Sequence, residues 1–158
     1  PIFALMPVRS VFSSQGSMIV AVPIFIVAST VAGTGSRWLA LLPVIWILHL
    51  GLVIGVAWLA SLLNTIVRDV QSVIGVMFIV LLIASPFAYT PEMVPAALKP
   101  LIYLNPMAYF IMAYQSVVAL GRPPSPLIST AIIAMGTGGF LLGGLLFDRL
   151  KSGVIDHV

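Results

Sequence analysis

The sequence contains no cysteine and very few charged residues. Without cysteine, the chain has no disulfide framework, no thiolate metal site and no cysteine nucleophile. Only 7% of its 158 residues are charged, against about 25% in an ordinary soluble domain. Hydrophobic residues make up 61% of the chain, and the mean hydropathy is +1.20. This composition excludes a soluble or disordered chain and predicts an all-α, polytopic transmembrane helical bundle.

Several classes of function are excluded on the same grounds. The net charge of +3 is too small to predict a nucleic-acid partner. The two histidines, His49 and His157, lie far apart, so no metal site is predicted, and no glycine-rich phosphate loop is present. Ser61 and Ser85 lack the strained turn and orienting carboxylate of a serine hydrolase. We therefore expect neither catalytic residues nor a cofactor of the chain's own.

Long stretches without charge indicate the membrane spans. No Asp, Glu, Lys or Arg occurs in residues 10–36, 38–67, 70–91 and 123–147. A helical span needs roughly 20 apolar residues. We predict four spans, at residues 18–34, 38–63, 70–89 and 126–147.

Residues 1–17 mix apolar side chains with serines, a glutamine and Arg9. Two interpretations are open: an amphipathic helix at a membrane surface, or the end of a preceding span. The chain begins with Pro1 rather than Met and shows no signal-peptide pattern. We therefore expect the N-terminal part of a longer protein to be absent.

Prolines interrupt the apolar stretch of residues 94–120. Pro95, Pro100 and Pro106 each bias the preceding residue away from the helical region. Of the two pieces that remain, the longer reaches only about 22 Å, short of a hydrocarbon core of about 30 Å. We predict a re-entrant helical hairpin; the alternative is one kinked span at 96–120. Broken backbone at this depth must be buried by protein or lined by water, which indicates a transport pathway.

The basic residues indicate the orientation only weakly. With a returning hairpin, one side carries Arg9, Arg68, Arg149 and Lys151, and the other carries Arg37, Lys99 and Arg122. The small excess favours cytoplasmic N- and C-terminal faces and an extracytoplasmic hairpin.

Within the predicted spans, His49 is the one ionisable group placed deep in the membrane. Such a group is a candidate proton relay, ligand contact or gate. A neutral imidazole bonded to a neighbouring helix is the simpler interpretation, and we favour it.

Small residues form helical faces on two predicted spans. They are Gly51 and Gly55 on one span, and Gly139 and Gly143, with Gly138 and Gly144 beside them, on another. Such faces allow helix backbones to approach closely, so we predict helix packing there.

Aromatic residues gather around the predicted hairpin. They are Phe87, Tyr89, Tyr103, Tyr109, Phe110 and Tyr114. An interfacial belt explains such residues in most membrane proteins. Because their flat apolar rings also suit sugar rings, Phe87, Tyr89, Tyr103, Tyr109 and Tyr114 are candidate sugar contacts.

An ordered set of local motifs resembles a known family. The motifs are Asn64-Thr65-Ile66-Val67-Arg68-Asp69-Val70, Ser85-Pro86-Phe87-Ala88-Tyr89, Leu104-Asn105-Pro106, Gly121-Arg122-Pro123-Pro124 and Phe147-Asp148-Arg149-Leu150-Lys151. Together they resemble the bacterial ABC-2 type permeases that export polysaccharide or polyol-phosphate chains, such as O-antigen, capsule or teichoic acid.

The resemblance implies a permease of the bacterial inner membrane that works as a homodimer with a separate ATP-binding subunit on a lipid-linked glycan. Residues 1–17 would be the cytoplasmic coupling segment, and Asn64, Arg68 and Asp69 would form a cytoplasmic link. Residues 94–120 would be the gate hairpin, with Pro95, Pro100, Asn105 and Pro106 at its breaks. The chain has fewer predicted spans than the family. A drug or lipid exporter of the same type and a non-transporting membrane scaffold remain as alternatives.

Overall fold

The computed structural model describes residues 2–33, 35–66, 69–86, 91–97 and 99–155, and throughout these ranges the regular structure is helical. The α-helices, in chain order, are α1 (Ile2–Ser14), α2 (Gly16–Val31), α3 (Leu42–Ile66), α4 (Val70–Ile83), α5 (Lys99–Leu104), α6 (Pro106–Val118) and α7 (Pro126–Ile155). Two short 3-10 turns, η1 (Arg37–Leu41) and η2 (Pro91–Met93), complete the set. The predicted all-α membrane class is confirmed.

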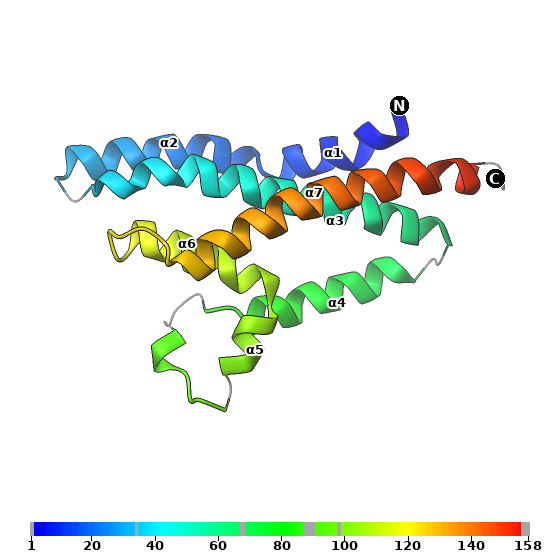
Figure 1. The fold of residues 1–158 in the computed structure, drawn as a ribbon. Helices are drawn as coiled ribbons and strands as arrows, with labels where there is room; N and C mark the ends of the chain where they lie inside the picture. Colours follow the sequence, from blue (N-terminus) through cyan, green and yellow to red (C-terminus); the bar gives the residue numbers. More distant parts are fainter. Residues whose placement is uncertain (1, 34, 67–68, 87–90, 98, 156–158) are drawn as a thin grey trace.

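The helices α3 and α7 form the centre of the molecule. The apolar helical stretches Arg37–Asn64, of 28 residues, and Pro126–Leu150, of 25 residues, are each long enough to cross a membrane. Figure 1 shows the two helices side by side and running in the same direction. One end of the molecule therefore holds Arg37 and the start of α7, and the other holds Asn64 and the end of α7. We call them the Arg37 end and the Asn64 end.

Glycines bring these two helices into close contact, as the small-residue faces predict. A Cβ atom added at Gly51 would lie 2.7 Å from the carbonyl oxygen of Gly136, and one added at Gly143 would lie 2.5 Å from the Cα of Gly55. One added at Gly55 would overlap the carbonyl oxygen of Gly139. Lipid offers no hydrophobic drive for helix association, so this close van der Waals packing holds the pair together.

The helices α1 and α2 form one apolar rod with a bend of 43° at Gln15, and as a pair they are long enough to cross a membrane. Val11 of α1 is buried against Leu50 and Ile54, in the middle of α3. The Nε1 of Trp46 lies 3.5 Å from the Oε1 of Gln15. Because α1 follows α3 in this way, the packing favours the interpretation of residues 1–17 as part of a span. Their coupling role stays a prediction.

The helix α4 ends at Ile83 and is therefore shorter than the predicted span of 70–89. Its 14 residues reach about 21 Å. Ser85 precedes Pro86 and is therefore disfavoured from the helical region, which explains the early end. Two described helices, or three with the bent pair, are long enough to cross a membrane. The count of four complete spans stays a prediction.

The predicted break in the hairpin occurs at Asn105, between α5 and α6. Asn105 has extended backbone angles, and its side chain accepts a hydrogen bond of 2.9 Å from the backbone N–H of Met107. Pro106 follows in the first helical position, where its missing N–H costs nothing.

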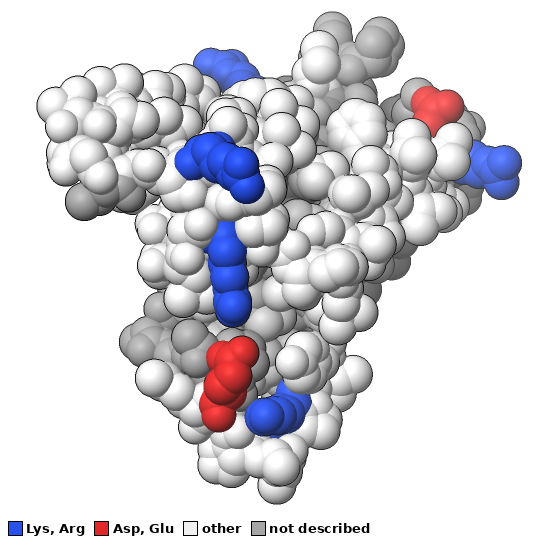
Figure 2. Space-filling view, turned by 60° about the vertical axis from the view of Figure 1, so that its left-hand side comes forward, with Lys and Arg blue, Asp and Glu red and all other residues white. Residues whose placement is uncertain are grey.

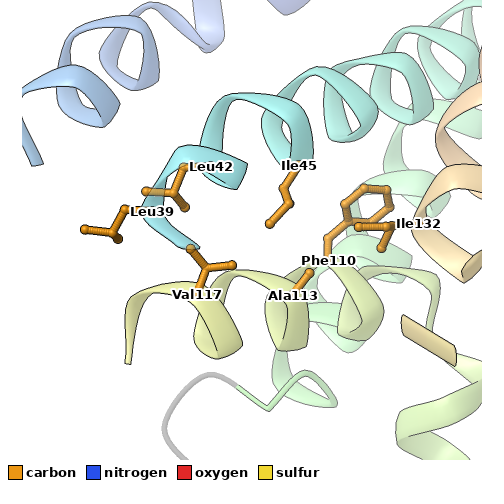
Figure 3. Packing of buried hydrophobic residues seen from close by; sticks show 7 residues of the cluster. All are labelled: Leu39, Leu42, Ile45, Phe110, Ala113, Val117 and Ile132. Carbon is orange, nitrogen blue, oxygen red and sulfur yellow. The ribbon is translucent and has the colours of Figure 1, made fainter. Parts of the chain in front are cut away.

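A buried cluster holds α6 against the first half of α3. Figure 3 shows its members, which are Leu39, Leu42, Ile45, Phe110, Ala113, Val117 and Ile132. Val117 faces η1 and the start of α3, whereas Phe110, two turns earlier in α6, reaches His49. The helix α6 thus runs from near the middle of α3 to the Arg37 end (Figure 1). This course favours the re-entrant hairpin over a single kinked span, and the hairpin's role as a gate stays a prediction.

Candidate gate site

A buried polar junction connects the end of α4 to the start of α6. The Nδ2 of Asn105 donates hydrogen bonds to the carbonyl oxygen of Leu81, at 2.8 Å, and to the hydroxyl of Ser85, at 2.9 Å. The hydroxyl of Ser85 in turn donates to the carbonyl of Leu81, at 2.6 Å. Asn105 is 2% exposed and Ser85 is 3% exposed. One side chain therefore bonds the last turn of one helix and caps the first turn of the next.

Gln115 provides a second connection between the same elements. Its Nε2 donates to the carbonyl oxygen of Pro86, a residue whose side chain is fully buried. We use the name gate junction for Leu81, Ser85 and Pro86 of the first element together with Asn105 and Gln115 of the second.

The chemistry of the gate junction matches the demands of a membrane interior. The last four carbonyls of a helix have no partner within that helix. In hydrocarbon an unsatisfied polar group costs several kcal/mol, so a helix can end at depth only where protein supplies a donor. The amide of Asn105 supplies one for the carbonyl of Leu81. Pro86 and Pro106 carry no N–H and so reduce the number of donors that need a partner.

His49 connects α3 to the other side of α6. Its ring stacks on Phe110 with a centroid distance of 5.0 Å and an angle of 26°. Its Nδ1 lies 3.5 Å from the hydroxyl of Tyr114, at the long limit for a hydrogen bond. These contacts are those of a histidine that joins two helices, which supports the structural interpretation over a proton relay. The role itself stays a prediction.

The candidate sugar contacts are distributed over two places. The hydroxyl of Tyr109 donates to the carbonyl of Tyr103 at 2.9 Å, and their rings lie 6.3 Å apart. Tyr114 lies apart from them, beside His49. Phe87 and Tyr89 lie outside the described residues, so their place in the site stays a prediction.

The remaining predicted site residues lie at helix ends and in connections. Pro95 and Pro100 are exposed, before α5 and in its first turn. Asn64 lies exposed in the last turn of α3, and Asp69 takes the cap position of α4 without a side-chain cap bond. Arg68, the third residue of the cytoplasmic link, lies outside the described residues. The sequence prediction missed Ser85 and Gln115, although a polar residue beside a proline and a glutamine in an apolar helix were both visible signals.

Comparison with known proteins shows which family the chain belongs to. The family model described as ABC-2 type transporter matches residues 5–118, well over half of the chain. This chain belongs to the ABC-2 type transporter family. Family membership and the apolar helices together show an integral membrane protein. The match includes both sides of the gate junction.

Two relatives of this chain carry a more specific name. An O-antigen export system permease protein RfbA of Klebsiella pneumoniae is 24% identical over 153 residues, covering 94% of this chain and 58% of the relative. An RfbA permease of Myxococcus xanthus is 21% identical over 136 residues, covering 83% of this chain and 52% of the relative. The chain thus spans little more than half the length of these two relatives. No solved structure matches it significantly.

Proposed function

We propose that this chain is the permease part of an ATP-driven exporter of lipid-linked polysaccharide in the bacterial inner membrane, with its N- and C-terminal faces in the cytoplasm. The observation that carries the transport proposal is the gate junction, where α4 ends, α6 begins and the buried side chain of Asn105 bonds the last turn of α4. Non-helical backbone inside a membrane is tolerated only where protein buries it or where it lines a water-filled cavity. Here protein buries it, and we infer that the junction forms the wall of a pathway beside it. The names of the two RfbA relatives support a glycan as the substrate.

The packing suggests which parts move. The glycine contacts make α3 and α7 one rigid unit, and the buried cluster and His49 attach α6 to it. The helix α4 packs against α3 and exposes apolar side chains on most sides, for example Val76 and Ile79. Its firmest described attachment is the gate junction at its inner end. We infer that α4 acts as a lever that transmits motion from the Asn64 end to the hairpin.

ATP would bind to a separate subunit at the cytoplasmic side, where it would contact residues 1–17 and the link that includes Asn64, Arg68 and Asp69. A second permease copy would cover part of the exposed apolar surface of α4. ATP binding then drives export only if the two states of the permease differ in their contacts with the partner, since equal binding shifts no equilibrium.

The test is reconstitution of the full-length permease with its ATP-binding subunit in proteoliposomes. We expect lipid-linked glycan to stimulate ATP turnover and to be translocated, and we expect Asn105→Ala to lower translocation. The variant Thr130→Ala is the control, because its hydroxyl bonds only carbonyls of its own helix, those of Pro126 and Leu127. Stimulation by drugs or phospholipids alone would support the other exporter class. If the permease binds no ATP-binding subunit and the proteoliposomes show no flux, the protein is a membrane scaffold.

A further inference from the structure

A groove of about 350 Å³ lies between the hairpin and the start of α7. Its polar lining comes from three parts of the chain: Glu92 of η2, Tyr103 of α5 with Gln115 and Ser116 of α6, and Arg122 with Ser125 before α7. Its volume lies at the lower end of the range of small-molecule sites, about 300–1,000 Å³. A groove of this size suits a unit of one or two sugar rings rather than a long polymer.

The lining combines one basic and one acidic side chain with neutral polar groups. A guanidinium donates, a carboxylate accepts, and an amide and hydroxyls do both. Ser116 is 6% exposed, and apolar side chains such as Met112 and Ile128 complete the lining. A purely apolar ligand would remove water from these polar groups and offer no hydrogen bond in return.

Tyr103 supplies an aromatic ring to the lining of the groove. Its side chain is 43% exposed at the groove, so a ring face is available to a ligand. A ligand with many hydroxyls and one apolar face, as in a neutral sugar, can replace the water on these groups and pack on the ring. A polyanion would be attracted by Arg122 but repelled by the carboxylate of Glu92, so it would gain little from this lining.

The groove lies where α6 ends and α7 begins, at the Arg37 end. Figure 2 shows the molecule with its left-hand side in Figure 1 brought forward, and on this face basic and acidic side chains follow one another from top to bottom. Gln115 belongs to the groove and also bonds Pro86 in the gate junction. A ligand in the groove would therefore contact a residue that holds the gate hairpin to α4.

We propose that this groove binds a neutral saccharide unit of the glycan on its way out of the pathway. The proposal rests on the proposed function, because it places an export substrate at the hairpin. It adds the site, the neutral class of ligand and the residues that recognise it.

The test is binding of the full-length permease, in lipid nanodiscs without its ATP-binding subunit, to an array of neutral and acidic bacterial oligosaccharides. We expect neutral oligosaccharides to bind, and we expect Tyr103→Leu and Arg122→Gln each to raise the dissociation constant of the best of them about tenfold or more. Both residues are exposed, so the variants should keep the melting temperature of the wild type. The control is Arg37→Gln, an arginine at the same end that lies over the ring of Trp38 and outside the groove.

The proposal is overturned if no oligosaccharide binds, if acidic ones bind better, or if Arg37→Gln weakens binding as much as Arg122→Gln. The assay needs neither ATP nor transport, so its result is separate from that of the reconstitution. If the permease exports glycan but the groove binds no saccharide, the saccharide site is refuted and the proposed export function stands. If the groove binds neutral saccharides but the reconstituted permease exports only drugs, the proposed glycan export is refuted and saccharide binding in the groove stands.

Discussion

The side-chain amide of Asn105 donates a hydrogen bond of 2.9 Å to the hydroxyl of Ser85, twenty residues earlier in the chain. Both side chains are almost fully buried. The bond joins the point where α4 stops to the point where α6 begins, so it connects the two broken halves of the candidate pathway. The account of this protein as a gated permease depends on that connection.

Replacing Asn105 by alanine should destabilise the protein and impair transport. The carbonyl of Leu81 would keep only the hydroxyl of Ser85 as its side-chain donor, and the backbone N–H of Met107 would lose its acceptor, at a cost of about 1–3 kcal/mol in all. Asn105→Asp should also impair transport, because a carboxylate cannot donate to the carbonyl of Leu81. Thermal unfolding in nanodiscs and glycan transport measure the two effects. A wild-type melting temperature and transport rate for Asn105→Ala would remove the gate junction from the mechanism.

Replacing Gly55 by leucine should separate α3 from α7. The new side chain would meet the backbone of Gly139, which cannot move aside within a helix. We expect a loss of about 3 kcal/mol or more, beyond the usual cost of overpacking, and little folded protein. Gly138→Leu is the matched control, because no neighbouring atom lies within 4 Å of a Cβ added there. Detergent-solubilised yield and size-exclusion profiles compare the two; equal profiles would contradict the glycine contact.

Variants of His49 separate packing from proton transfer. His49→Phe keeps a ring against Phe110 and loses only the long contact to Tyr114, so transport should stay within about twofold of the wild type. His49→Ala removes the ring and should lower the free energy of unfolding by about 1–3 kcal/mol. Transport assays between pH 6 and pH 8 measure this distinction. Equal loss of transport in both variants, with unchanged stability, would instead indicate a proton relay.

Asp69 tests the predicted cytoplasmic link. Its side chain makes no cap bond to α4, so Asp69→Ala should change stability by no more than about 0.5 kcal/mol. If the residue contacts the ATP-binding subunit, the same variant should weaken co-purification of that subunit and lower glycan-stimulated ATP turnover. Unchanged co-purification and turnover would show that Asp69 is not part of a link to the ATP-binding subunit.

The sequence predicts the elements whose signals are local. Charge-free apolar stretches locate the spans that became α3 and α7, and the proline after Asn105 locates the break between α5 and α6. The glycine faces predict close packing because their spacing along one helix is sufficient evidence. The rule for residues before proline also explains the early end of α4 at Ile83, although the apolar run itself continues beyond Pro86.

Contacts between distant segments cannot be predicted from local sequence patterns. Nothing in the local sequence pairs Ser85 with Asn105, or places Val11 beside Leu50, because these contacts depend on how the helices cross. The groove is a similar case, since Glu92, Tyr103 and Arg122 come from three separate segments. The pattern predicts polar and aromatic residues near the hairpin, and only the fold shows which of them face one another.

The most direct measurement of the central claim is cysteine labelling in intact cells, which the absence of cysteine from this stretch makes simple. Single cysteines replace Glu92, Arg122 and Asn64, and a membrane-impermeant maleimide is added before or after permeabilisation. The account predicts that the cysteines at Glu92 and Arg122 react from outside, whereas that at Asn64 reacts only after permeabilisation. If the cysteine at Arg122 reacts only after permeabilisation, the stretch between Glu92 and Arg122 crosses the membrane, and the re-entrant gate is contradicted.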